Sequence, residues 1–140
     1  SRIARRVVLE VTERAALYRV DHLSSRIEAL RKLGYRIAVD DLGASHAGLS
    51  RFRELGPDIV KLDVSLVRDV DSSPSKTSLI RSMIALCTQE LGMRVVCEGV
   101  ETEGERDALR AIGADLQQGY LFGMPARGFQ VYGGVTSAAS

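Results

Sequence analysis

The chain has 140 residues, of which 45% are hydrophobic and 26% are charged, a composition that suits one folded globular domain and excludes a disordered segment. Its formal net charge is only +1, which argues against a nucleic-acid polymer as the main partner. The sequence contains no long uncharged apolar run, so we expect no membrane span.

The first part of the chain predicts a strand followed by a helix. Val7–Val11 is a short β-branched run typical of a strand, although Glu10 interrupts it. A helix is expected from Asp21, as its N-cap, to Leu33, because apolar residues recur there at spacings of three and four. Gly34 follows at the position where a left-handed residue commonly ends a helix.

The second predicted strand ends in two adjacent acids. Ile37–Val39 is apolar throughout, as expected for a buried parallel strand, and Asp40 and Asp41 follow directly. Like charges this close repel each other, and burial deprives each carboxylate of its hydration. The two acids therefore lie either in open solvent or against a cation, and the rest of the chain favours the cation.

The remaining elements continue the alternation of helices and strands. The expected helices are Ala47–Leu55, Ser73–Leu91 and Thr102–Gly113, and the expected strands are Asp58–Asp63, Arg94–Gly99 and Gln117–Phe122. In the longest helix, the apolar spacing predicts a buried face made of Leu79, Met83, Ile84, Leu86 and Leu91. Thr102 and Glu105 have the spacing of a capping box.

A recurring pair of residues indicates the fold class. Each expected helix ends in an apolar residue followed by glycine, at Leu33-Gly34, Leu55-Gly56, Leu91-Gly92 and Ile112-Gly113, and a strand begins shortly afterwards. Strands that alternate with helices in this way predict an α/β fold with a parallel sheet.

Polar side chains stand at or near the end of almost every expected strand. They are Glu10, Asp40, Asp41, Lys61, Asp63, Glu98 and Gln118. In a (β/α)8 barrel such strand ends converge on the face that carries the active site. Carboxylate and amide oxygens suit Mg²⁺ or Mn²⁺, and two such ions can hold a phosphodiester for attack by water.

Each of these residues also has an ordinary structural interpretation. Lys61 could lay its aliphatic stem on the core, and Asp63 could cap the turn before Ser65. Glu10 could cap a loop, and Glu101 could favour the positive end of the next helix. Singly these interpretations are reasonable, but together they do not explain why the polar residues fall at the same end of successive strands.

Two cysteines bear on the compartment. Cys87 and Cys97 show no CxxC spacing, which favours free, packed thiols in a reducing compartment over a disulfide or a zinc site. The beginning of the chain does not read as a signal peptide, because Glu10 follows the arginines too soon. We therefore expect a cytoplasmic protein.

Five short motifs, in their order and spacing, resemble the EAL family of cyclic di-GMP phosphodiesterases. They are Leu9-Glu10-Val11-Thr12-Glu13, Asp40-Asp41-Leu42-Gly43, Val60-Lys61-Leu62-Asp63, Glu98-Gly99-Val100-Glu101-Thr102 and Gln118-Gly119-Tyr120-Leu121-Phe122. The resemblance implies a (β/α)8-type barrel that binds cyclic di-GMP and hydrolyses it to linear pGpG with two Mg²⁺ or Mn²⁺ ions.

The resemblance also implies a role for each matching residue. Glu10, Asp40 and Asp41 would bind the metals, and Lys61 and Glu98 would position or activate the water. Asp63, Glu101 and Gln118 would support them or contact the substrate, and Glu13 would hold the loop after Asp41. That loop departs from the family pattern at Ser45, where a glycine is usual, and His46 follows it.

The chain is short for a whole barrel, which needs about 250 residues. The family's Glu-Ala-Leu motif and an asparagine ligand would precede Leu9 and are not in this sequence. We therefore expect residues 1–127 to form the C-terminal five βα units of a barrel and residues 128–140 to form a flexible tail. Alone, the chain is expected to be inactive and to associate as a homodimer or with the missing half of the barrel.

Three functions remain open at this point. The parent barrel hydrolyses cyclic di-GMP, or it is a degenerate member of the family that binds the nucleotide or a protein partner without turnover. The third possibility is a metal-dependent barrel outside this family that acts on a different substrate.

Overall fold

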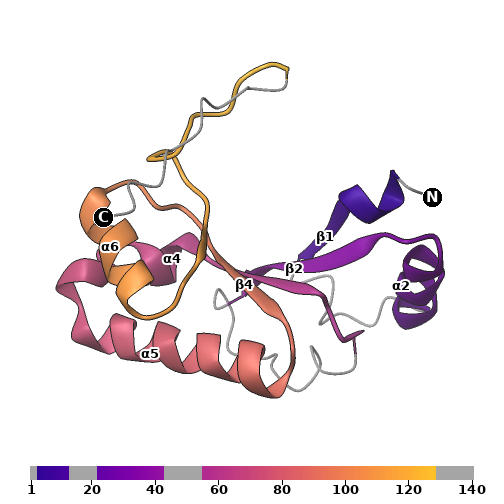
Figure 1. Ribbon diagram of the computed structural model, residues 1–140, viewed down its shortest axis with the longest axis horizontal. Helices are drawn as coiled ribbons and strands as arrows, with labels where there is room; N and C mark the ends of the chain where they lie inside the picture. The colour runs from indigo at the N-terminus through magenta and orange to yellow at the C-terminus, as the bar shows by residue number, and fades with distance from the viewer. Residues whose placement is uncertain (1–2, 13–21, 43–54, 129–140) are drawn as a thin grey trace, which may run out of the picture.

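The computed structural model describes residues 3–12, 22–42 and 55–128, and it shows an α/β fold built on a parallel five-stranded sheet (Figure 1). The strands are β1 (Val8–Thr12), β2 (Arg36–Leu42), β3 (Ile59–Leu62), β4 (Arg94–Cys97) and β5 (Leu116–Gln117). They lie in the order β1-β2-β3-β4-β5, and every neighbouring pair is parallel. Consecutive parallel strands joined through helices are the arrangement of a segment of a (β/α)8 barrel, which confirms the expected fold class.

Helices cover one face of this sheet. Figure 1 shows α2 at one end of the view and α5 and α6 at the other, with the strands between them. The helical elements are η1 (Ala4–Arg6), α2 (Leu23–Lys32), α4 (Val64–Val67), η2 (Val70–Ser72), α5 (Pro74–Ala85), the π-helical turn η3 (Leu86–Glu90) and α6 (Glu103–Ala111). Among the described residues, no helix has the length and the apolar character needed to cross a membrane.

The core lies between the helices and alternate residues of the strands. Ile27 of α2, Ile80 of α5 and Leu109 of α6 belong to one buried cluster with Val39, Val60 and other outward-facing strand residues. Successive strand residues point to opposite faces. Lys61, between Val60 and Leu62 of the core, therefore faces the other side of the sheet. Val11 and Val39 are aligned with Val60, so their neighbours Glu10 and Asp40 face that side as well.

The glycines that were expected to end helices have the backbone conformation which that role requires. Gly34, Gly56, Gly92 and Gly113 all have positive φ angles, of 99°, 50°, 66° and 89°. L-residues with a side chain rarely adopt this conformation, so glycine is the natural choice after each helix. The expected helix Ala47–Leu55 lies, apart from Leu55, outside the described residues.

The predicted buried face of α5 is wrong in part. Leu79 and Leu86 are 48% and 37% exposed, whereas Ile80 and Cys87 are buried. The helix carries two apolar stripes one residue apart, and periodicity alone does not decide which of them faces the sheet. The regular helix also ends earlier than predicted, at Ala85, and continues as the π-helical turn.

Two other predicted boundaries also shift. Helix α2 begins at Leu23, after His22, which has a left-handed φ of 68° and provides no side-chain cap; Asp21 lies outside the described residues. The last strand was predicted as Gln117–Phe122, but β5 has only two residues. A Cβ atom on Gly119 would overlap the backbone of Val100, and the chain turns there, because Phe122 N–H donates to the carbonyl of Gly119 over 3.1 Å.

Candidate active site

A buried lysine stands at the centre of a group of acids on the face of the sheet opposite the helices. Lys61 is only 6% exposed. Its Nζ lies 2.7 Å from Glu98 Oε1, 3.0 Å from Glu10 Oε1 and 3.4 Å from Asp40 Oδ1. These four residues come from β1, β2, β3 and the end of β4, so the parallel register brings together side chains that are distant in sequence.

The acids keep this lysine charged. Burial alone would favour the neutral amine, but the hydrogen bonds that Lys61 donates to Glu98 and Glu10, together with the charge of Asp40, raise the pKa of Lys61 above its usual range. Glu98 is the closest partner of Lys61 among these acids. Burial raises the pKa of Glu98 to about 7, even though the hydrogen bond from Lys61 acts to lower it. The site therefore pairs a permanent cation with a carboxylate that exchanges its proton near neutral pH.

The two adjacent aspartates lie at an irregularity of β2. The register between β2 and β3 shifts between Val39 and Leu42, and Asp41 has a left-handed φ of 62°. A left-handed conformation is costly for a residue with a side chain, although aspartate tolerates it better than most. Regular alternation would send the two carboxylates to opposite faces of the sheet. The irregularity instead brings both of them to the C-terminal end of the strands.

The acids at the C-terminal end of the strands are spaced to bind a divalent cation. Single carboxylate oxygens of Asp40, Asp41 and Glu98 lie within 4.8 Å of one another. Burial raises the pKa of Asp41, and the neighbouring charges of Asp40 and Asp63 raise it further. Repulsion of this kind is relieved by a bound cation, and oxygen ligands are those that Mg²⁺ and Mn²⁺ prefer.

The other predicted residues have varied surroundings. Glu10 contacts Lys61 and lies outside the group of three acids spaced for a cation, with its side chain 49% exposed. Asp63 caps α4, because its Oδ1 accepts a hydrogen bond from the N–H of Ser65 over 2.9 Å. Glu13 lies outside the described residues, as do Ser45 and His46.

Glu101 and Gln118 line a hollow at the same end of the sheet as Lys61 and its acidic partners. The hollow has a volume of about 270 Å³, and its other lining residues are Val64, Gly99, Gly119 and Tyr120. It lies among the segments that follow β3, β4 and β5, and therefore at the same end of the sheet as Lys61 and Glu98. The structure thus brings two predicted supporting residues together at this end of the sheet.

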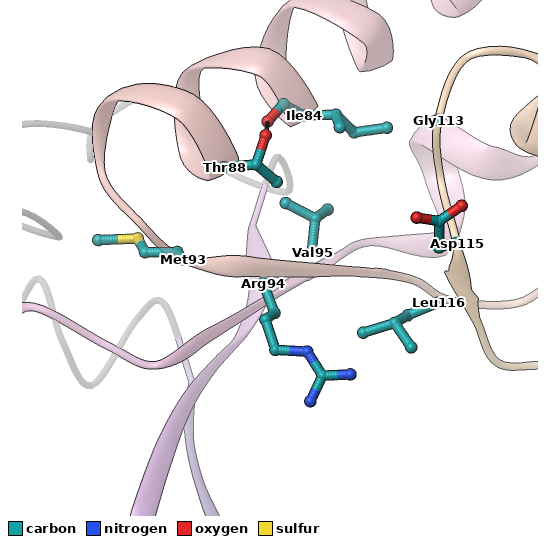
Figure 2. A pocket seen from close by; sticks show the side chains of 8 residues that line it. All are labelled: Ile84, Thr88, Met93, Arg94, Val95, Gly113, Asp115 and Leu116. Atoms are coloured by element: carbon teal, nitrogen blue, oxygen red, sulfur yellow. Dashed lines mark hydrogen bonds between the residues drawn. The ribbon is translucent and has the colours of Figure 1, made fainter.

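A second hollow lies at the other end of β4 and offers a different chemistry. Its lining residues are Ile84, Thr88, Met93, Arg94, Val95, Gly113, Asp115 and Leu116, around a volume of about 330 Å³ (Figure 2). Figure 2 shows Val95 pointing toward α5 and Arg94 pointing away from it. Asp115 is the only acid among the described residues that line this hollow, and most of the other lining side chains are apolar. The hollow is therefore a poor candidate for the reaction site.

Comparison with known proteins identifies the family. The sequence matches the EAL domain family over residues 1–125. The chain belongs to the EAL family. It is 38% identical over 117 residues to the cyclic di-GMP phosphodiesterase NbdA of Pseudomonas aeruginosa, which covers 84% of this chain and 15% of NbdA. It is 36% identical over 119 residues to the probable cyclic di-GMP phosphodiesterase PdeA of Escherichia coli, which covers 85% of this chain and 16% of PdeA.

Solved EAL structures resemble the fold closely. Klebsiella pneumoniae BlrP1, in its manganese and cyclic di-GMP complex at pH 9.0, superposes with a TM-score of 0.81 at 39% identity, over 87% of this chain and 31% of BlrP1. A standalone EAL protein from Vibrio cholerae O395, in its c-di-GMP-bound form, gives a TM-score of 0.78 at 30% identity, over 87% of this chain and 51% of that protein. The chain therefore spans a small part of its curated relatives and about half of a standalone EAL protein. Membership of the EAL family also removes the alternative of a barrel from outside it.

One buried acid of this EAL chain is not indicated as buried by its sequence pattern. Glu105 is 2% exposed and accepts hydrogen bonds from the backbone N–H groups of Asp69, Glu101 and Thr102. The capping-box spacing correctly predicted its partnership with Thr102. Its contact with Asp69, which is 36 residues away in the sequence, is one that no local pattern could indicate.

Proposed function

We propose that this chain is the part of an EAL domain that carries Lys61 and the metal-binding acids, and that the domain hydrolyses cyclic di-GMP to linear pGpG. The observation that carries this proposal is the buried Lys61 in contact with Glu98, Glu10 and Asp40. The names of the relatives support it, because NbdA is a cyclic di-GMP phosphodiesterase and BlrP1 was solved with manganese and cyclic di-GMP.

The donor set suits Mg²⁺ or Mn²⁺. Asp40 and Asp41 would hold the ion, and Glu98, whose carboxylate oxygen lies within 4.8 Å of theirs, would hold the attacking water beside it. When bound, such an ion acts as a Lewis acid on the phosphodiester. A second ion would bind at the same end of the strands, with Glu10 as a further ligand.

Hydrolysis adds one water molecule across one of the two phosphodiesters of the cyclic nucleotide. A bond forms between phosphorus and the water oxygen, the bond between phosphorus and the 3′ oxygen breaks, and the ring opens to pGpG. Glu98 lies beside Lys61 and next to the acids that would hold the ion, and is therefore placed to accept the proton that the attacking water loses. The leaving 3′ oxygen takes up a proton, so the proton count balances.

Lys61 contributes a positive charge whose position is already set. Three carboxylates hold its Nζ, so the ammonium group does not need to reorganise as negative charge develops on the phosphoryl oxygens. Because Lys61 is buried in β3, this charge lies in a region of reduced solvent screening. Its contribution is expected to be larger in the transition state than in the bound ground state.

The working domain is proposed to include more strands than the five in this sheet. Strands β1 and β5 form its two edges among the described residues. A parallel sheet normally has both faces covered, and open edges pair readily with other strands. We infer that the rest of a barrel, or a second copy of the chain, closes this sheet, and that the protein acts in the cytoplasm.

The experiment is a product analysis with the intact protein that contains this chain. Cyclic di-GMP is incubated with the protein and Mn²⁺, with a parallel reaction that contains a chelator, and the nucleotides are separated by chromatography. We expect pGpG to appear with Mn²⁺ and to be absent with the chelator. Tight binding of cyclic di-GMP without any pGpG would instead show a degenerate EAL module.

A further inference from the structure

Glu105 is a buried carboxylate outside the lysine cluster that joins two segments distant in sequence. Its Oε2 accepts hydrogen bonds from the N–H groups of Glu101 (2.8 Å) and Thr102 (3.2 Å). Its Oε1 accepts one from the N–H of Asp69, over 3.1 Å. One side chain therefore ties the segment after β4 to the segment after β3.

Arg68 adds a charged contact to this arrangement. Its guanidinium lies 2.7 Å from Glu101 Oε1 and 3.5 Å from Glu105 Oε1. Burial alone would raise the pKa of Glu105, but the backbone N–H groups of Glu101, Asp69 and Thr102, together with the charge of Arg68, hold it below its usual range. We call this set, made of Arg68, Asp69, Glu101, Thr102 and Glu105, the Glu105 clamp.

The clamp holds more than a helix end. An ordinary capping box joins the first turn of a helix to its own N-cap, and here Thr102 and Glu105 form that box. The bonds to Asp69 and Arg68 are additional, and they reach the segment that follows β3. The clamp thus links the segments after β3 and β4. Lys61 lies in β3, and Glu98 directly follows β4.

The segment Glu98–Thr102 is anchored at both of its ends. At the first end, the N–H of Glu98 donates to the carbonyl of Leu62 over 3.1 Å. At the other end, the clamp binds the backbone of Glu101 and Thr102. Between them, Gly99 has a φ of 73° and packs against Val64 so closely that a side chain at that position would overlap it. The segment therefore has little freedom to shift while the clamp is intact.

We propose that Glu105 is a positioning residue for the active site, one that keeps the Glu98 carboxylate against Lys61 and beside Asp40 by holding the far end of its segment. This inference rests on the proposed function. It predicts that weakening the clamp lowers turnover and metal affinity, even though Glu105 contacts neither Lys61 nor the acids around it in the described contacts.

The test compares two variants of the intact protein with the same chemical change. Glu105→Gln removes the charge of Glu105 and replaces one of its two acceptor oxygens with an NH2 donor. Glu103→Gln makes the same change two residues earlier in α6, where the side chain is 77% exposed and pairs only with Arg106 among the described residues. Glu105→Asp, which keeps the charge on a shorter side chain, is measured beside them. Turnover of cyclic di-GMP, the Mn²⁺ dependence of the rate and the melting temperature are recorded for each.

We expect Glu105→Gln to lower kcat at least about tenfold, because a small displacement of a catalytic group such as the Glu98 carboxylate costs this much or more. KM for cyclic di-GMP is expected to change by less than about threefold, and half-maximal activity is expected to need more Mn²⁺. Glu103→Gln is expected to match the parent. If Glu105→Gln does not fold, Glu105→Asp is judged by the same criteria. A folded Glu105 variant with parental kcat and Mn²⁺ dependence, whatever its melting temperature, would overturn the inference.

A separate readout distinguishes this inference from the proposed function. If the parent protein itself produces no pGpG, the proposed function fails, and the clamp is then judged by calorimetric titration with Mn²⁺ alone. Weaker Mn²⁺ binding by Glu105→Gln than by Glu103→Gln would support the positioning role. Equal Mn²⁺ affinities for the two variants would refute it.

Discussion

Lys61 Nζ lies 2.7 Å from Glu98 Oε1, across two neighbouring strands whose register sets Leu62 opposite Cys97. Each of the two groups changes the protonation of the other. Lys61 remains a cation, and Glu98 titrates near neutral pH because burial outweighs the attraction of the lysine. The protonation of Glu98 therefore affects both the stability of the fold and the charge of the active site.

The first prediction concerns the pH dependence of stability without metal. The pKa of Glu98 is about 7 in the folded state, against 4.5 as its ordinary value, so the folded protein binds more protons between these values. The free energy of unfolding should therefore fall as the pH rises from about 4.5 to about 7. Urea unfolding at several pH values, with a chelator present, measures this decline.

A matched pair of variants attributes that decline to one residue. Glu98→Gln should remove most of it, whereas Glu28→Gln, a change at an exposed position of α2, should leave it in place. A decline of the same size in Glu98→Gln would show that another group is responsible.

The second prediction concerns Asp41. Asparagine tolerates the left-handed conformation at least as well as aspartate, so Asp41→Asn should keep the backbone, which has a φ of 62°. It should raise the melting temperature of the metal-free protein, because it removes the repulsion between Asp41 and Asp40. It should also weaken Mn²⁺ binding by about tenfold or more, since a charged ligand is lost. Calorimetric titration and thermal unfolding measure the two effects, and an unchanged Mn²⁺ affinity would remove Asp41 from the metal site.

The third prediction tests which face of α5 is buried. Ile80 is 0% exposed and Leu79 is 48% exposed, although the two are adjacent. Ile80→Ala should reduce the free energy of unfolding by about 2–5 kcal/mol, as expected for a buried aliphatic side chain. Leu79→Ala should reduce it by less than about 1 kcal/mol. Chemical denaturation compares them, and a larger loss for Leu79→Ala would restore the face that periodicity suggested.

Local sequence patterns predicted the parts of this molecule that depend on neighbouring residues. Glycine after an apolar residue marked helix ends correctly at Gly34, Gly92 and Gly113, because the left-handed conformation is a local requirement. Acids at the ends of successive strands predicted a cluster, and Lys61 does meet Glu10, Asp40 and Glu98. A parallel sheet brings such strand ends together regardless of where the helices between the strands begin and end.

The features that sequence patterns missed depend on contacts between distant segments. The buried face of α5 is decided by the sheet, because Leu79 and Ile80 are equally apolar choices for the helix itself. Buried Glu105 accepts a hydrogen bond from Asp69, which belongs to another segment. β5 ends before Gly119, which closely approaches Val100 of the segment after a different strand.

The most direct test of the proposed function is the rate of pGpG formation by Lys61→Ala in the intact protein with Mn²⁺. Lys32→Ala, which removes an exposed lysine from α2, is the matched control. We predict that Lys61→Ala lowers kcat by about a hundredfold or more while cyclic di-GMP still binds, because the lysine acts mainly in the transition state. Lys32→Ala should keep the parental rate. A Lys61→Ala protein that forms pGpG at the parental rate would contradict the account of this site.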